Sequence, residues 1–391
     1  MQKSSLRPPK APTPELPTPD AHPFVDVDLA ALCRNFTRLA EASPDALPAA
    51  VVKCNGYGLG LGPVSRALAI DRNVRTFFVA HAAVGAELRG ILNDLAPHAD
   101  IFIFNGPTPS TLNVFLEHRL TPVLNTLDQA VLWARRGGGA PAALHIDTGI
   151  NRLGIRTEQA ANAAKIAALN ITWVMSHFAS AALPDAPKNQ EQFAAFVDAA
   201  DYFPNARKSL ASTAGGLLSA DYGLDMVRLG VGLYGVGPFG EPDDIVEPVA
   251  TLRAPILRVE PALRGETAGY DETHRFEEDT VIATVALGYG DGFPRAASNR
   301  ASCMIGGATR PIVGRISMDL TIIDAGPDYE PNNEADDGCV EIFGKHLPIE
   351  KASADCGTIG YELLTSLGPR VERRYFWDDT TADKALTGWS E

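Results

Sequence analysis

The alternation of short strand-like runs with amphipathic stretches between residues 24 and 245 most constrains the fold of this chain. Strands separated by one helix each favour parallel pairing, because a parallel connection has to cross back over the sheet. Eight such units in about 220 residues predict a (β/α)8 TIM barrel, with a doubly wound open sheet as the alternative. The expected strands centre on residues 51–53, 77–79, 101–104, 122–124, 144–147, 173–175, 209–211 and 227–229, and the expected helices are 83–92, 108–118, 127–136, 158–169 and 190–202.

The regions on either side of this pattern have a different character. Residues 1–23 contain seven of the 29 prolines and few large apolar side chains, which predicts a disordered Pro-rich tail. From residue 246 to residue 391 helical periodicity nearly vanishes, which predicts a β-strand-rich C-terminal domain after the barrel of residues 24–245. The expected strands of that domain lie within 252–259, 281–287, 308–323 and 340–343.

Composition excludes several classes of function. The 48 acidic and 34 basic side chains give a net charge of −14, which argues against nucleic acid or an anionic membrane as partner. The five cysteines are scattered and form no CxxC pair, so neither a disulfide framework nor a structural zinc site is expected. No run approaches about 18 apolar residues, and residues 1–23 lack the apolar core of a secretory signal. We therefore expect a cytoplasmic location.

Cationic and small polar side chains lie at the carboxyl ends of the expected barrel strands, where barrel enzymes place their active sites. Lys53 ends the first strand and suits a Schiff-base lysine, because burial lowers the pKa of an amine. Arginines suit a carboxylate, and the hydroxyl and glycine residues of 212–216 suit a phosphate. Singly, each has an ordinary structural explanation, such as a solvated lysine or a core histidine. Together they indicate pyridoxal phosphate acting on an amino acid.

Six motifs, spread over both expected domains, resemble those of the alanine racemase family of fold-type III pyridoxal-phosphate enzymes. The resemblance covers roughly residues 24 to 375. The motifs are AVVKCNGYG at 50–58, DTGINRLG at 147–154, DMVRLGVGLYG at 225–235, GY at 269–270, LGYGDG at 287–292 and GRISMD at 314–319. The 19-residue spacing from Tyr270 to Tyr289 agrees with the family pattern.

The resemblance implies a two-base mechanism. Lys53 would hold the cofactor and serve as one base, and Tyr270 of the partner subunit would serve as the other. Racemisation removes the α-proton from one face and returns a proton to the opposite face, so one base is not enough. His177 and Arg228 would support Tyr270, whose phenol has an ordinary pKa of about 10. The implied cofactor-binding residues are Lys53, Tyr57, Arg152, Thr213, Arg228, Gly230, Val231 and Tyr361, and the implied substrate-binding residues are Arg152, Tyr289 and Met318.

The implied function is racemisation of L-alanine and D-alanine, supplying D-alanine for peptidoglycan, by a homodimer with shared active sites. The alternatives are an amino-acid racemase of broader specificity, for example toward serine, and a non-catalytic pyridoxal-phosphate carrier. The well-formed second domain with Tyr270 disfavours the carrier. An arginine at position 228 disfavours a decarboxylase, which would place a carboxylate at the pyridine nitrogen. A metal-dependent hydrolase would need more clustered His and Asp, and no metal is expected.

Some residues depart from the family pattern. His145 stands seven positions before Arg152, where the family often has a lysine that can carry a carbamate. Another anion or a water would then position Arg152, or Arg152 would be held less firmly. Thr213 replaces the usual serine and keeps the hydroxyl. Asp271 and His274 replace a common glycine and tyrosine, which leaves the substrate range open.

Overall fold

The structure is a computed structural model that describes residues 21–331 and 337–377. These residues divide into two compact units. The first comprises residues 26–250, 359–365 and 373–377, and the second comprises 21–25, 251–331, 337–358 and 366–372. Of the expected Pro-rich tail, residues 1–20 lie outside the described residues.

The first unit is a barrel of eight parallel strands. Its strand order is β10-β2-β3-β4-β5-β6-β8-β9, and a two-residue strand β7 (Ile155–Arg156) pairs with β6. The barrel strands are β2 (Leu47–Val51), β3 (Thr76–Val79), β4 (Asp100–Ile103), β5 (Thr121–Leu124), β6 (Ala142–Asp147), β8 (Ile171–Met175), β9 (Arg207–Ser209) and β10 (Met226–Leu229). All pairs along this order are parallel. The predicted (β/α)8 barrel with eight strands is therefore confirmed, although β2 and β9 lie earlier than expected and share only Val51 and Ser209 with the expected runs.

Hydrogen bonds between the segments of β9 and β10 close the barrel. The amide of Asp225 donates to the carbonyl of Lys208 (3.0 Å), and the amide of Arg228 donates to that of Ala211 (3.1 Å). A parallel bridge joins Ser212 and Arg228. Closure leaves the barrel sheet without a free edge, so every strand is paired on both sides.

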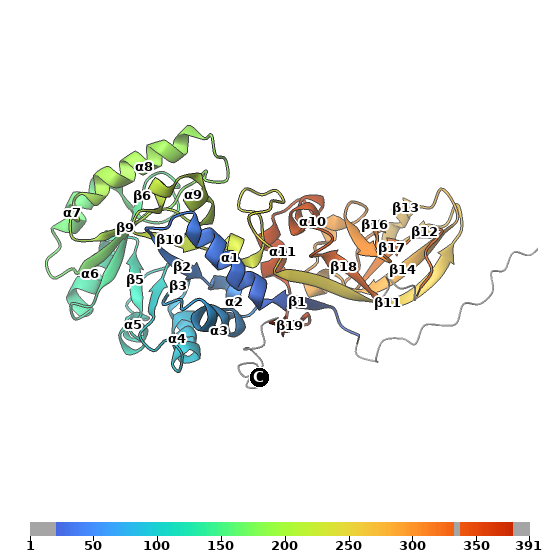
Figure 1. Ribbon diagram of the computed structural model, residues 1–391, viewed down its shortest axis with the longest axis horizontal. Helices are drawn as coiled ribbons and strands as arrows, with labels where there is room; N and C mark the ends of the chain where they lie inside the picture. Colours follow the sequence, from blue (N-terminus) through green and yellow to red (C-terminus); the bar gives the residue numbers. More distant parts are fainter. Residues whose placement is uncertain (1–20, 332–336, 378–391) are drawn as a thin grey trace, which may run out of the picture. The chain divides into compact units, whose positions relative to one another are not determined.

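Helices surround the barrel strands (Figure 1). They are α1 (Leu29–Glu41), α2 (Lys53–Tyr57), α3 (Leu61–Asp71), α4 (Ala82–Leu92), α5 (Leu112–Glu117), α6 (Leu127–Arg136), α7 (Ala160–Ala164), α8 (Pro187–Ala200) and α9 (Thr213–Leu218), with 3-10 turns η1 (Thr157–Gln159), η2 (Ala220–Gly223) and η3 (Val231–Tyr234). The single helix expected at 158–169 is wrong. That stretch forms η1 and α7, and the chain then turns through Ala168, whose φ is 63°.

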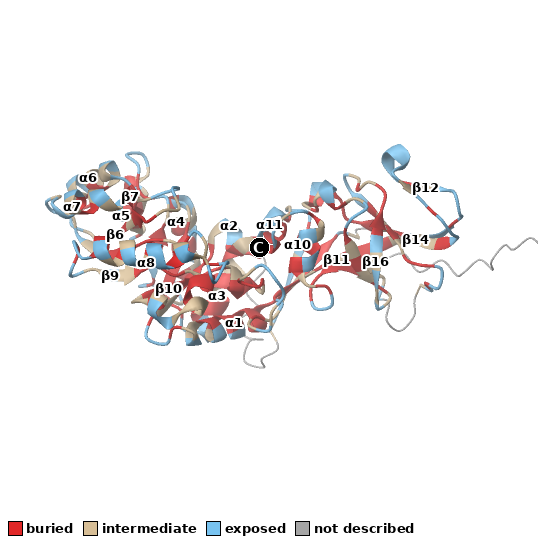
Figure 2. Ribbon diagram, turned by 90° about the horizontal axis from the view of Figure 1, so that it is seen from above, coloured by how far each residue is buried: buried red, intermediate tan, exposed pale blue. Residues whose placement is uncertain are grey.

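The interior of the barrel is filled by side chains from alternate strand positions. Phe78 and Phe102 are register partners on neighbouring strands, and their rings stack with centroids 4.6 Å apart. Trp173 meets Phe102 edge to face at 6.3 Å. Figure 2 shows the buried residues concentrated along the strands and on the inward sides of the helices. Packing of this kind makes the strand ends a rigid platform for side chains at the rim.

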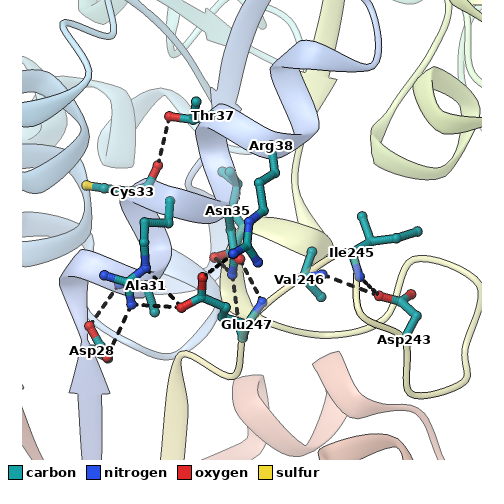
Figure 3. Close-up of polar contacts among 12 residues, drawn as sticks. Asp28, Ala31, Cys33, Asn35, Thr37, Arg38, Asp243, Ile245, Val246 and Glu247 are labelled. Carbon is teal, nitrogen blue, oxygen red and sulfur yellow. Dashed lines mark hydrogen bonds and ion pairs between the residues drawn. The ribbon is translucent and has the colours of Figure 1, made fainter.

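A clamp joins α1 to the end of the barrel segment (Figure 3). The fully buried Asn35 donates from Nδ2 to the carbonyl of Glu247 (2.9 Å) and accepts from the Glu247 amide at Oδ1 (2.8 Å). The Glu247 carboxylate pairs with Arg34 (2.8 Å) and Arg38 (2.7 Å) on the same helix. Asp28 caps α1 by accepting the amide of Ala31 at 2.8 Å. The first barrel helix and the last barrel segment are thus held together by side chain and backbone.

The second unit is built on antiparallel strands in the order β14-β17-β16-β15-β18-β11. The strands are β11 (Ala250–Ala262), β12 (Thr267–Ala268), β13 (His274–Arg275), β14 (Thr280–Ala286), β15 (Ser302–Ile305), β16 (Ala308–Val313), β17 (Leu320–Asp324) and β18 (Cys339–Phe343). The turns η4 (Tyr270–Glu272), η5 (Tyr289–Asp291) and η6 (Arg295–Ala297) and the helix α10 (Ile349–Asp355) complete it. β1 (Phe24–Asp28), α11 (Gly360–Ser366) and β19 (Glu372–Phe376) each have residues in both units.

The single run expected at 308–323 is two strands, β16 and β17, paired antiparallel with Ile312 opposite Ile323. Gly314 reverses the chain with a φ of 71°, and a Cβ there would lie 2.7 Å from the carbonyl oxygen of Ala268. Only glycine tolerates both conditions, so the chain turns at this position. The turn carries the 314–319 motif.

Across residues 21–331 and 337–377, the structure contains no helix that combines the length and the apolar character required to cross a bilayer.

Candidate active site

The barrel unit contains a cavity of about 570 Å³ at the carboxyl ends of its strands. Side chains that follow or end β2, β4, β6, β8, β9 and β10 line it. It brings together all nine expected residues of the barrel unit, namely Lys53, Tyr57, Arg152, His177, Thr213, Arg228, Gly230, Val231 and Tyr361. Tyr361 comes from the returning segment 359–365, which belongs to the same unit.

Lys53 begins α2 directly after β2 and is half-buried. Burial lowers the pKa of its ammonium, and the nearby Arg152 guanidinium lowers it further, because both disfavour the charged form. Its Nζ lies 5.9 Å from the centre of the Phe104 ring, which forms part of the apolar wall. An amine with a lowered pKa is more often neutral near pH 7 and is therefore a better nucleophile and base.

The turn after Lys53 runs through left-handed backbone. Cys54, Asn55, Gly56 and Tyr57 have φ values of 52°, 56°, 60° and 53°. Each non-glycine residue in this region costs about 1–2 kcal/mol, so the surrounding contacts must impose the conformation. Asn55 Oδ1 accepts the amide of Leu61 at 2.8 Å, and a side chain at Gly58 would overlap the carbonyl of Leu364. Strain of this kind accompanies functional positions.

Segments from the end of the chain hold this turn in place. Arg373 donates from Nε to the carbonyl of Gly58 (3.1 Å), and the Tyr375 hydroxyl donates to the carbonyl of Leu59 (2.9 Å). Residues 359–365 and 373–377 therefore belong to the barrel unit although they follow most of the second unit in sequence.

A compact polar cradle lies beside Lys53. The Thr213 hydroxyl accepts the amide of Gly230 at 2.9 Å, and a Cβ at Gly230 would lie 2.9 Å from the Tyr57 hydroxyl. The Tyr57 ring stacks on that of Tyr234 at 4.4 Å, and burial raises the pKa of the Tyr57 phenol, so it stays a donor. Two hydroxyls and backbone amides around a side-chain-free glycine form a site for an anion of phosphate size.

Arg228 is 4% exposed and makes four polar contacts, three of which share the two N–H groups of its Nη2. Its Nη1 donates to the Ser209 hydroxyl (2.6 Å), and its Nη2 donates to the carbonyls of Ser176 (2.6 Å) and Leu210 (3.0 Å). Burial lowers the pKa of its guanidinium to about 10, which leaves it charged at neutral pH. No carboxylate pairs with it among the described residues, so its charge is available to the cavity.

His177 is oriented by Arg228. The fourth contact of Arg228 joins its Nη2 to the His177 Nδ1 at 3.3 Å. Arginine has only donors, so Nδ1 must accept and the ring proton lies on Nε2. Burial, with Arg228 second, lowers the pKa of His177 well below its ordinary value. His177 is therefore a neutral imidazole that can donate from Nε2.

The Asp147 carboxylate shapes the loop that carries Arg152. Its Oδ1 accepts the amides of Gly149 (2.9 Å), Ile150 (3.0 Å) and Asn151 (3.1 Å). Asp147 is 6% exposed and ends β6, so it fixes the loop to the barrel. Within the described residues the Arg152 guanidinium has no hydrogen-bond or ion-pair partner, which leaves it free for a ligand carboxylate.

The remaining expected residues belong to the second unit. Tyr270 lies in η4, is 67% exposed and follows Gly269, whose φ is 71°. Tyr289 and Met318 lie side by side, because the Tyr289 amide donates to the carbonyl of Ser317 (3.1 Å) and both side chains are exposed. The structure thus joins Tyr289 with Met318 and places Tyr270 separately on an exposed turn.

Sequence reasoning gave no role to three polar residues that support the site. Ser209 binds Arg228, Asp147 binds the Arg152 loop, and Asn125 binds His145 through its Oδ1 at 2.8 Å. All three lie at or just after the carboxyl end of a barrel strand, which was the available signal. Among residues 21–331 and 337–377, no group of three or more His, Cys, Asp or Glu side chains is arranged to hold a metal ion.

The fold and its cavity place this chain among barrel proteins that hold a half-buried lysine beside an anion-binding cradle, the class that includes pyridoxal-phosphate enzymes of barrel fold. The family model described as "Alanine racemase, N-terminal domain" matches residues 27–238. The one described as "Alanine racemase, C-terminal domain" matches residues 249–375. The chain belongs to the alanine racemase family, as the resemblance predicted.

Individual relatives agree with this assignment. The alanine racemase of Methylobacterium nodulans is 38% identical over 356 residues, covering 89% of this chain and 95% of the relative. That of Rickettsia canadensis is 38% identical over 357 residues, covering 89% and 98%. The crystal structure of alanine racemase from Bartonella henselae with covalently bound pyridoxal phosphate has a TM-score of 0.84 at 32% identity, covering 91% of this chain and all (100%) of that chain.

Proposed function

We propose that this chain binds pyridoxal 5'-phosphate and interconverts L-alanine and D-alanine. The observation that carries the proposal is the cavity at the strand ends of the barrel, which Lys53, Arg152 and Arg228 line together with the cradle at Gly230. The cradle suits the phosphate because the hydroxyls of Tyr57 and Thr213 both lie at Gly230. A Cβ at Gly230 would crowd the Tyr57 hydroxyl, and the Thr213 hydroxyl accepts the Gly230 amide. When bound, the cofactor withdraws electrons from the α-carbon of an amino acid and acidifies its proton.

Lys53 holds the cofactor covalently and acts as the base on one face of the substrate. Its burial and the charge of Arg152 lower the pKa of its ammonium, so more of the amine is neutral and able to take a proton near pH 7. Val231 and Tyr361 line the same cavity and would complete the phosphate contacts beside Thr213. We assign this cofactor-binding role to the barrel of residues 24–245.

Tyr270 acts as the base on the opposite face. Its exposed position on η4 suits a side chain that reaches the cavity of a partner subunit, so we infer a homodimer with shared active sites. His177 carries its proton on Nε2, and donation from that atom to the phenolate oxygen would favour the ionised phenol. Arg228 orients His177 through the contact between its Nη2 and the His177 Nδ1. The domain of residues 246–391 thus supplies the second base.

Arg228 would also hold the cofactor, by donating to its pyridine nitrogen. Because a guanidinium keeps its proton, Arg228 would not transfer one to that nitrogen, so the electron withdrawal that the cofactor supplies would be weaker and side reactions would be restrained. Arg152 would bind the substrate carboxylate and the phenolic oxygen of the cofactor. In the proposed homodimer, the neighbouring residues Tyr289 and Met318 reach the substrate mouth from the other subunit and narrow it, which favours the methyl side chain of alanine.

We infer that the D-alanine serves peptidoglycan synthesis. The cytoplasmic location stays a prediction from the scattered cysteines.

The test is α-deuterium exchange in D2O over a panel of L-amino acids, with pyridoxal phosphate added to the purified protein. We expect alanine to exchange fastest and both enantiomers to appear. Faster exchange of serine would indicate a racemase of broader specificity. Cofactor binding without exchange of any amino acid would identify a carrier and refute the proposal.

A further inference from the structure

The two histidines that line the cavity are held in opposite neutral tautomers. His177 accepts at Nδ1 from Arg228 and carries its proton on Nε2. His145 has its Nδ1 2.8 Å from the Oδ1 of Asn125. The Asn125 amide group donates from Nδ2 to the carbonyls of Phe104 (2.8 Å) and Val123 (3.0 Å), so its Oδ1 is an acceptor. His145 must therefore donate from Nδ1 and leave Nε2 unprotonated.

The unprotonated nitrogen of His145 faces the cavity. Asn125 is buried and does not line the cavity, whereas His145 does, so the ring edge opposite Nδ1 is the one that the cavity meets. The backbone amide of Asn125 also donates to the Oε1 of Gln129 at 2.7 Å, which helps to hold Asn125 in place beside His145. Burial, with the positive charge of Arg228 second, lowers the pKa of His145 to about 4. At neutral pH the cavity thus contains a hydrogen-bond acceptor that carries no charge.

Three cations, Arg228, Lys53 and Arg152, line this cavity with His145, and within the described residues hydrogen bonds hold only Arg228. The four contacts of Arg228 already hold it to Ser209, Ser176, His177 and Leu210. Lys53 is the proposed attachment point of the cofactor. The guanidinium of Arg152 has no partner within the described residues, and it lies close enough to shift the pKa of both His145 and Lys53.

We propose that His145 is a positioning residue: when a ligand carboxylate enters the cavity, the His145 Nε2 accepts an N–H from Arg152 and keeps that guanidinium turned toward the carboxylate. The inference rests on the proposed role of Arg152 in substrate binding. A neutral acceptor suits this task, because it orients the guanidinium without cancelling the charge that the carboxylate needs. Two residues of β6 would then position Arg152. Asp147 fixes the backbone of the loop that carries Arg152. His145 lies two residues earlier on the same side of the strand and would orient the Arg152 side chain.

The experiment measures the binding of propionate, a carboxylate without an amino group, to the holoenzyme by titrating the cofactor absorbance. His145→Phe keeps an aromatic ring and loses the acceptor, and we expect propionate to bind about tenfold more weakly. His145→Gln keeps an amide N–H for Asn125 and a carbonyl acceptor for Arg152, and should stay within about threefold of wild type. His98→Phe, at an exposed histidine outside this cavity, is the matched control.

A double-mutant cycle with Arg152→Met separates positioning from a general structural effect. If His145 acts through Arg152, His145→Phe should cause no further loss of propionate binding once Arg152 is absent. Equal propionate affinity of His145→Phe and wild type, or an equal loss in both backgrounds, would overturn the proposal. If thermal unfolding shows that His145→Phe is not folded, His145→Leu takes its place in the cycle.

Racemisation by the wild-type protein is measured separately. Absence of alanine racemisation together with His145-dependent propionate binding would refute the proposed function and leave the role of His145 standing.

Discussion

Removal of the Asp147 carboxylate should weaken substrate binding by disordering the loop that carries Arg152. In Asp147→Ala the amides of Gly149, Ile150 and Asn151 lose their common acceptor. These residues are partly or fully exposed, so water replaces part of each bond, and a net loss of about 1 kcal/mol per bond is reasonable. Three bonds give about 3 kcal/mol, which corresponds to roughly a hundredfold change in the population of the ordered loop.

We therefore expect kcat/KM for L-alanine to fall by up to about a hundredfold in Asp147→Ala, mainly through a higher KM. Asp147→Asn keeps the acceptor oxygen without its charge, and neutral bonds are about half as strong, so the loss should be nearer tenfold. Asp94→Ala, at an exposed carboxylate in a surface turn, is the control and should change neither constant.

Steady-state racemisation by each variant, with thermal unfolding to verify the fold, provides the measurement. A KM in Asp147→Ala within twofold of wild type, at unchanged thermal stability, would refute this reasoning. It would mean that the packing of the loop, and not the three bonds, positions Arg152.

Further predictions concern the cofactor and the barrel clamp. Lys53→Ala should abolish both turnover and the absorbance of bound cofactor, and retained racemisation would contradict its role. Thr213→Val should weaken cofactor binding about tenfold in a spectrophotometric titration while Thr213→Ser does not, because only valine removes the hydroxyl on the Gly230 amide. Asn35→Ala should lower the free energy of unfolding, measured by urea denaturation, by about 2 kcal/mol, because the backbone of Glu247 loses its two hydrogen bonds to Asn35. Asn170→Ala, at an exposed asparagine, is the control, and an equal effect there would argue against this explanation. The hydrogen bond from Arg34 lowers the pKa of the Glu247 carboxyl. Its ionised form therefore stabilises the fold above the ordinary glutamate pKa of about 4.3, and the stability difference between wild type and Glu247→Gln should disappear as the pH falls through the lowered value.

Most of the barrel could be predicted from the sequence, because buried parallel strands leave runs of apolar residues at regular intervals. Phe77, Phe78 and Val79 illustrate this, since all three are fully buried and fall within β3. The expected run at 308–323 failed for a physical reason. Its two halves are equally strand-like, and only the close approach of Ala268 to Gly314 shows that the chain reverses there.

The positions of the main site residues could also be predicted, because barrel topology brings strand ends together. The supporting contacts could not. The proton positions on His145 and His177 depend on Asn125 and Arg228, which are 20 and 51 residues away in sequence. Nothing in the local sequence of either histidine distinguishes a donor from an acceptor. Hydrogen-bond partners from other barrel strands determine which ring nitrogen carries the proton, and only the folded structure identifies these partners.

The returning segments 359–365 and 373–377 have a consequence for synthesis of the protein. A ribosome that has completed the barrel strands has not yet made Tyr361, Leu364, Arg373 or Tyr375, which touch the cavity and the left-handed turn after Lys53. The nascent barrel can close its sheet while the lysine turn still lacks the contacts that impose its strained backbone. Competence to bind the cofactor should therefore arise only once residues 359–377 have been made, after most of the second unit has emerged.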